Sequence, residues 1–168
     1  MKRFLMVAGL AVLMLAGGAG VAQAQKERSP KTWELTSATC PRLPAGTTVK
    51  GTGTETAVTR TITDPATGIV TVVNYTKTVG TATDNKGGKY TFDYRNSFHV
   101  RNSAAAPGTY IGTMFDLFAL KGRGPSKIRN GFTAIMTTDL TSSFVFQPLL
   151  AWGDPIDFTD GAPHCDPL

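Results

Sequence analysis

The chain has 168 residues, with 17 lysines and arginines against 12 acidic residues, which gives a formal net charge of +5 at pH 7. This length is typical of one domain that can bury a core without metals or dense disulfides. The basic residues are scattered, and we interpret the densest run, from Lys121 to Arg129, as a solvated turn. The composition therefore argues against a nucleic-acid partner.

Residues 1–24 have the pattern of a secretory signal peptide. Lys2 and Arg3 precede an apolar run from Phe4 to Val21, and Ala22-Gln23-Ala24 is a small-x-small cleavage site. The alternative is an uncleaved membrane anchor, which the glycines in the run and the cleavage site disfavour. We therefore predict export to the periplasm or the medium, with no stable membrane span in the mature chain.

Residues 25–46 are polar and contain proline, with few large apolar side chains. We predict that they form an N-terminal arm laid on the domain, anchored by Trp33 in a surface groove and pinned through Cys40. Residues 47–168 would then form an antiparallel β domain.

The two cysteines, Cys40 and Cys165, lie near the two ends of the mature chain. An exported protein folds in an oxidising compartment, where such a pair tends to close into a disulfide. A bridge across a loop of about 125 residues stabilises a fold by roughly 4 to 5 kcal/mol in the chain-entropy description. A metal site that uses His164 and Cys165 does not match zinc-ligand spacing, so we predict no metal and no cofactor.

The first long hairpin is predicted from threonine-rich and valine-rich segments. Residues 47–64 and 69–82 are rich in β-branched side chains and are separated by the turn sequence Asp64 to Gly68. Gly51 and Gly53 indicate a bulge or a close backbone approach in the first of these strands. Weak alternation of apolar residues indicates that much of this hairpin is half-exposed.

The second hairpin, from Lys86 to Leu120, is the clearest in the sequence. Residues 89–101 alternate almost perfectly between apolar and polar side chains, which predicts a strand with one face on the core. Residues 109–120 are apolar on both parities, which predicts a strand that is covered on both faces or lies inside the sheet. A turn at residues 106–108 connects the two.

Two polar residues break the pattern of this hairpin. Asn96 lies on the apolar face of its strand, either as a satisfied buried amide or as a polar anchor in a ligand cavity. Asp116 interrupts the doubly apolar strand, and we expect its carboxylate to lie at a rim or to pair with an arginine.

Towards the C-terminus, residues 128–137 are predicted to form a strand. Residues 144–150 form a shorter one, which Pro148 restricts to an edge or bulged position. No segment past residue 25 has a helical pattern. The fold class is therefore all-β: a single antiparallel β-barrel or a curled sandwich of about six to eight strands built from consecutive hairpins.

No catalytic signature is present. There is no nucleophile elbow, and nothing in the spacing brings two carboxylates together. Arg95, His99 and Arg101 share the polar face of the 89–101 strand. They would bind an anionic small molecule if that face lined a barrel, and they would be ordinary solubilising charges if it pointed outward. The outward orientation is favoured because aromatic residues usually form the core.

Three functions remain open. The favoured hypothesis is a non-enzymatic exported domain that binds a small apolar or amphipathic molecule, or a partner protein. The second is a small-barrel enzyme that uses Arg95, His99 and either Asp93 or Asp116, and the third is a structural envelope protein without a pocket. The candidate pocket residues are Tyr94, Arg95, Asn96, His99, Tyr110, Met114 and Asp116.

Overall fold

In the computed structural model, residues 23–103, 106–141, 143–153, 156–157 and 164–165 are described. These residues form strands and no helix, as the sequence predicts. The strands are β1 (Gln23–Thr36), β2 (Thr48–Thr63), β3 (Val70–Asp84), β4 (Lys89–Ser103), β5 (Ala106–Arg123), β6 (Ile128–Thr138), β7 (Phe144–Trp152), β8 (Ile156–Asp157) and β9 (His164–Cys165).

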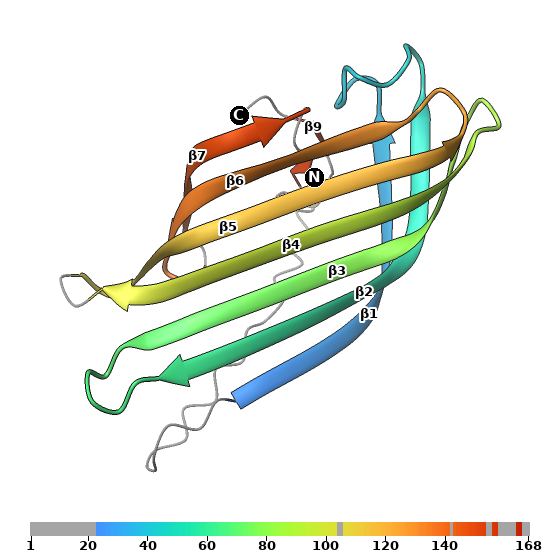
Figure 1. Ribbon diagram of the computed structural model, residues 1–168. Coiled ribbons are helices and arrows are strands. Elements are labelled where there is room, and N and C mark those ends of the chain that lie inside the picture. Colours follow the sequence, from blue (N-terminus) through green and yellow to red (C-terminus); the bar gives the residue numbers. More distant parts are fainter. Residues whose placement is uncertain (1–22, 104–105, 142, 154–155, 158–163, 166–168) are drawn as a thin grey trace, which may run out of the picture.

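Strands β1 to β7 form one antiparallel sheet in which every strand pairs with its neighbour in sequence (Figure 1). The sheet is strongly curled but is not closed into a barrel, so of the two predicted architectures the curled sandwich describes it and the barrel does not. Strands β8 and β9 pair only with each other.

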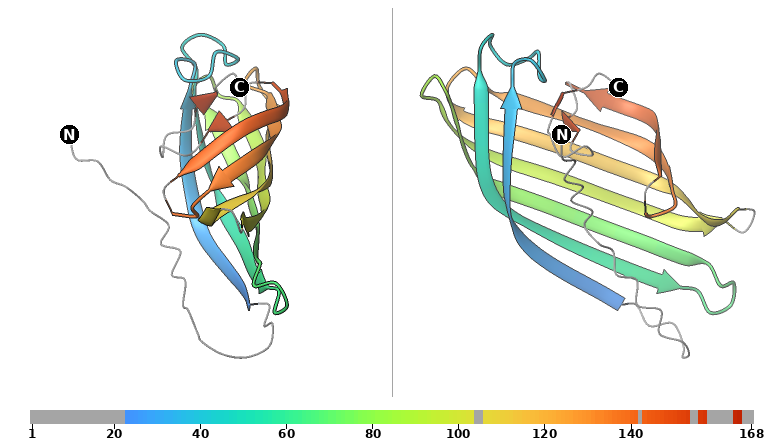
Figure 2. Two further views of the ribbon diagram at one scale, coloured as in Figure 1. Left: turned by 90° about the vertical axis from the view of Figure 1, so that its left-hand side faces the viewer. Right: turned by 180° about the vertical axis from the view of Figure 1, so that it is seen from behind.

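The curl comes mainly from β1 and β2. The ends of these strands that lie next to their connecting loop bend away and cross the end of the sheet, which is clearest from behind in Figure 2. We call the side towards which they bend the concave face and the opposite side the convex face. The β8–β9 pair also lies on the concave side, between the bent hairpin and β7 (Figure 2).

Close packing of glycines and aromatic rings permits this bend. Gly51 pairs with Trp33, and a Cβ at Gly51 would overlap the Trp33 ring. Gly53 pairs with Gly80, and a Cβ at either would meet the Phe92 ring. The predicted close backbone approach is confirmed, whereas the register shows no bulge at these glycines.

Two apolar clusters occupy the concave face. The first lies beneath the bent hairpin, where Trp33 meets Phe92 and Phe118 edge-on at 5.2 and 5.5 Å between ring centroids. Its buried members are Trp33, Leu35, Cys40, Leu43, Val49, Ala82, Tyr90, Phe92, Phe118, Leu120 and Ile128. The second lies towards the other end of the sheet and consists of buried Val72, Val100 and Met136 with partly buried Val70, Phe98, Tyr110, Met114, Leu140 and Phe146.

The N-terminal segment differs from the expected arm. Residues 25–46 contribute most of edge strand β1 and the loop to β2, and Trp33 is buried in the first cluster rather than in a surface groove. The sequence pattern did not predict β1 as a strand, because an edge strand whose outer part lies in solvent lacks alternating apolar residues. Residues 1–22 lie outside the described residues, so the signal peptide stays a prediction.

The remaining strand predictions are confirmed. Strand β5 lies inside the sheet, and β7 is an edge strand whose register to β6 shifts opposite Pro148. The Asp64–Gly68 turn forms as expected, with Gly68 at a φ of 70° and the Asp64 carboxylate accepting from the Ala66 amide. Among the described residues, no helix is long and apolar enough to cross a membrane.

Candidate functional site

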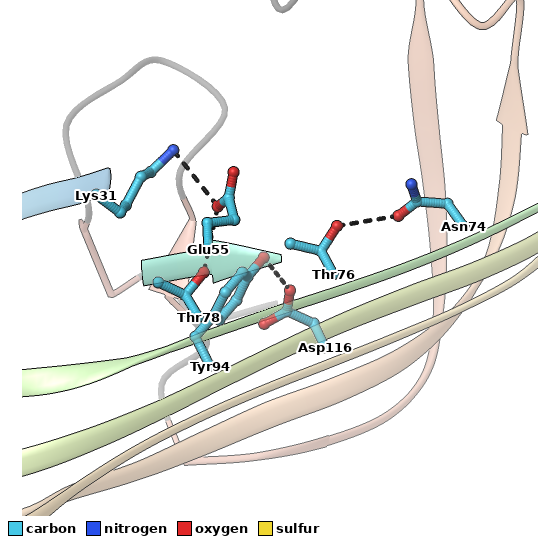
Figure 3. A network of polar contacts seen from close by, with 7 residues as sticks. All are labelled: Lys31, Glu55, Asn74, Thr76, Thr78, Tyr94 and Asp116. Atoms are coloured by element: carbon cyan, nitrogen blue, oxygen red, sulfur yellow. Dashed lines mark hydrogen bonds and ion pairs between the residues drawn. The ribbon is translucent and has the colours of Figure 1, made fainter. Parts of the chain in front are cut away.

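The two residues that break the sequence pattern are direct partners. Asn96 of β4 pairs in register with Asp116 of β5, and the Asn96 side-chain amide donates to Asp116 Oδ2 at 3.0 Å. The Tyr94 hydroxyl donates to the same oxygen at 2.8 Å (Figure 3). A polar pair therefore stands where two strands that are otherwise apolar on this face meet.

Asp116 is only 3% exposed, so the predicted rim position is wrong. Burial of a carboxylate is costly unless hydrogen bonds replace its water, and here Tyr94 and Asn96 both donate to one of its two oxygens, Oδ2. Burial, followed by the nearby negative charge of Asp116 and the hydrogen bond to it, holds the pKa of Tyr94 well above its usual value. Tyr94 therefore stays a hydrogen-bond donor at physiological pH.

The polar surface continues across β3, β2 and β1. Thr78, which pairs with Tyr94, donates from its hydroxyl to Glu55 Oε2 at 3.2 Å. The same Glu55 oxygen lies 3.7 Å from Lys31 Nζ. Glu55 is partly exposed, with 24% of its side chain accessible. This arm of the network therefore reaches towards solvent at the β1 edge.

A second arm lies one row further along the same strands. Thr76 pairs with Asn96 and donates to Asn74 Oδ1 at 3.1 Å, and Asn74 donates to Thr59 Oγ1 at 2.9 Å. Figure 3 shows both arms on the same side of the sheet. We call this network the polar belt; its members are Lys31, Glu55, Thr59, Asn74, Thr76, Thr78, Tyr94, Asn96 and Asp116.

The polar belt lies between the two apolar clusters. Along β4, Phe92 of the first cluster is followed on the concave face by Tyr94 and Asn96, and then by Phe98 of the second cluster. The same order holds along β5, where Asp116 separates Phe118 from Met114. The concave face thus offers hydrogen-bonding groups next to partly buried apolar side chains, which is the chemistry of a site for an amphipathic molecule.

The structure divides the predicted pocket residues into three groups. Tyr94, Asn96 and Asp116 belong to the polar belt, while Tyr110 and Met114 pack in the adjoining second cluster. Arg95 and His99 lie on the convex face of β4 and are exposed. The polar face of this strand therefore points outward, and its aromatic face meets the core.

The convex-face groups also fail to assemble a catalytic site with Asp116. Arg95 binds Asp93 through two hydrogen bonds, from Nε to Oδ1 at 3.0 Å and from the guanidinium to Oδ2 at 2.7 Å. Asp116 lies on the other side of the sheet, so it does not converge with Arg95 and His99. Asp93, the alternative acid, meets Arg95 on the convex face. Among the described residues, no group of three or more histidine, cysteine or acidic side chains is placed to hold a metal ion.

Sequence reasoning missed the part of the polar belt that comes from β1 to β3. Glu55, Thr76 and Thr78 belong to threonine-rich strands with weak alternation, so no pattern separates them from solvent-facing threonines. Only the strand register brings them beside Tyr94 and Asn96.

The structure does not test the predicted disulfide. Cys40 is completely buried in the first cluster, and the described residues include no free thiol. The Cys165 side chain lies outside the described residues, so the Cys40–Cys165 bridge stays a prediction.

Comparison of the chain with protein-family models, curated proteins and solved structures finds no match.

Proposed function

We propose that this protein is an exported, non-enzymatic β domain that binds a small amphipathic molecule on its concave face. One observation carries the proposal: the hydrogen-bonded Tyr94–Asn96–Asp116 group lies between two apolar clusters on the side towards which the sheet curls. The polar part of the molecule would form hydrogen bonds with the polar belt. Its apolar part would lie on the second cluster, against Phe98 and Met114.

The composition of the second cluster favours a small molecule over a rigid protein partner. Several of its members, among them Met114 and Phe98, are only partly buried, so apolar surface remains for a ligand to cover. Methionine side chains adapt to ligands of varied shape. The belt adds orientation, because a ligand that covered its polar groups with apolar atoms would remove their water without replacing its hydrogen bonds and would lose affinity.

Native mass spectrometry of the exported protein tests the proposal directly, and we expect an added mass that denaturation releases. Binding of the neutral amphipathic dye Nile red, followed by its fluorescence, gives a probe of the same surface. We expect Asn96→Ala and Met114→Ala each to weaken dye binding by about fivefold or more, which corresponds to roughly 1 kcal/mol.

The matched controls are His99→Ala and Arg95→Ala, which change the same strand on its convex face. Both should leave dye binding unchanged. The proposal is wrong if the exported protein carries no added mass and the concave-face and convex-face variants bind the dye equally well.

A further inference from the structure

The two faces of the sheet carry opposite charge. In strands β1 to β6, the register places every basic residue except Lys31 on the convex face. It places every acidic residue except Glu34 and Asp93 on the concave face, and both of these exceptions form ion pairs, with Lys50 at 3.0 Å and with Arg95 at 2.7 Å. The convex face is therefore far more positive than the modest net charge of the chain suggests.

The positive charge is concentrated on β1 to β4. Lys77 of β3 lies directly opposite Arg95 of β4. On its other side Lys77 lies opposite Thr56 of β2, which in turn lies opposite Arg28 of β1. Arg60 and Arg101 lie on the same face, and within the described residues neither they nor Lys77 form an ion pair. We call this surface the basic face; its residues are Lys26, Arg28, Arg60, Lys77, Arg95 and Arg101.

Like charges directly opposite each other destabilise a sheet. In the row Arg28–Thr56–Lys77–Arg95, Lys77 and Arg95 are directly opposite each other and carry an electrostatic cost in the free protein. The Asp93 carboxylate, which pairs with Arg95 at 2.7 Å and also attracts Lys77, offsets part of this cost. A bound anionic surface would remove this cost. The arrangement is more than a solubilising set of charges, because such a set normally mixes both signs.

Exposed apolar side chains are interleaved with these cations. Tyr75 and Val79, 43% and 42% exposed, flank Lys77 on the same face of β3. Ile111, 44% exposed, stands directly opposite Arg101. Arg101 and Ile111 also line, together with Thr113 and Ile135, a shallow depression of about 590 Å³.

We propose that the basic face docks the protein onto an anionic lipid surface. Cations that bind lipid phosphates, with apolar side chains between them that enter the headgroup layer, are the chemistry of peripheral membrane binding. A single-stranded nucleic acid would instead need a series of aromatic platforms for successive bases. Among the exposed apolar side chains of this face only Tyr75 is aromatic, while Ile62, Val79 and Ile111 are aliphatic. This docking uses the face opposite the proposed ligand site, so the two proposals fail independently.

The test is co-sedimentation of the full mature protein with vesicles of phosphatidylcholine, alone or mixed with phosphatidylglycerol. We expect binding only to the anionic vesicles, and weaker binding at high salt because exposed charges are screened. The double variant Arg60→Gln/Lys77→Gln should bind about tenfold or more weakly, since each basic residue near an anionic surface contributes several-fold. The matched control is Lys86→Gln/Lys127→Gln, which removes the same charge from two loops outside the strands and should bind nearly as the parent does.

A third variant separates lipid docking from binding of a soluble polyanion. Tyr75→Ser/Ile111→Ser keeps every charge, so it should weaken vesicle binding but not binding to dextran sulfate. Equal losses in the Arg60/Lys77 and Lys86/Lys127 variants would show an effect of net charge alone and overturn the proposal. Binding to dextran sulfate or single-stranded DNA without binding to anionic vesicles would also overturn it, and would assign the face to a soluble polyanion.

Discussion

At the scale of single residues, the carboxylate of Asp84 accepts hydrogen bonds from four donors. Oδ2 accepts from the Tyr90 hydroxyl at 2.6 Å and from the Ser126 hydroxyl at 2.9 Å. Oδ1 accepts from the amides of Lys86 and Gly88 at 2.9 and 2.7 Å. One side chain thereby joins the β3–β4 turn to the loop between β5 and β6.

These hydrogen bonds, first the one from Tyr90, lower the pKa of Asp84 to about 2. Because the pKa in the folded protein is below its ordinary value, the ionised carboxylate stabilises the fold above about pH 4. This contribution is lost as the pH falls through about 2. Tyr90→Phe should therefore lower the free energy of unfolding by about 1 to 3 kcal/mol at pH 7, and by less at pH 2.

Chemical denaturation at the two pH values measures this difference. Tyr75→Phe is the matched control, because the Tyr75 side chain is exposed on the convex face and its change should stay within about 0.5 kcal/mol at both pH values. If Tyr90→Phe costs the same stability at pH 2 as at pH 7, the Tyr90–Asp84 bond is not the source of the effect.

The sequence was most informative about the candidate site at the level of single residues. Asn96 and Asp116 are conspicuous because each interrupts an apolar pattern, and the structure brings these two side chains together. Arg95 and His99 carry no such signal. They follow the alternation of their strand, and the structure places them on the convex face with the other regular polar positions.

At the scale of elements, the bend of the β1–β2 hairpin depends on glycines. At Gly53 a Cβ would overlap the Val79 carbonyl oxygen and the Phe92 ring, and neither can move, because one is backbone of the next strand and the other is buried. Threonine and valine favour the strands, but the glycines decide where those strands can pack closely.

Gly53→Val should therefore destabilise the protein by about 1 to 3 kcal/mol or more, because overpacking forces the sheet and the Phe92 ring apart. Thr52→Val is the matched control, because Thr52 is the neighbouring position on the opposite face and is exposed. Thermal or chemical denaturation measures both variants. A Gly53→Val protein as stable as the Thr52→Val protein would mean that the close packing of Gly53 and Phe92 does not support the bend.

Strand β1 illustrates the limit of pattern analysis for an element. Its outer residues, from Ala24 to Pro30, are all exposed, and only Trp33 and Leu35 enter the core. Period-two alternation reports burial on one face, so a strand that extends into solvent lacks it. Its pairing with β2 along the whole strand is a property of the register and not of its composition.

At the scale of the whole molecule, β1 and β7 are edge strands that pair on one side only within the described part of the chain. The packing beneath the bent hairpin holds the curled layers together. Cys40 is buried there, in the loop between β1 and β2. The β8–β9 pair, which contains Cys165, lies on the same side of the sheet (Figure 2). A Cys40–Cys165 bridge would tie the end of the chain across the open side of the fold.

If the bridge forms, Cys165→Ser should lower the free energy of unfolding by about 4 to 5 kcal/mol, as expected for a long closed loop. Reducing agent should lower the stability of the parent protein by a similar amount and leave Cys165→Ser unchanged. Intact-mass measurement after alkylation without reduction should show no modified cysteine. Two alkylated thiols in the protein purified without reductant would show that the bridge is absent.

The sequence by itself determined the fold class, the hairpin order and most strand positions, because alternation, β-branched residues and turn residues are local signals. It also singled out Asn96 and Asp116. The tertiary structure alone decided that the sheet stays open, that β1 belongs to it, and which face of β4 meets the core. It also assembled the polar belt and gathered the scattered basic residues onto the convex face. Those features depend on strand register and on the bend at the glycines, and both arise from contacts between residues far apart in the chain.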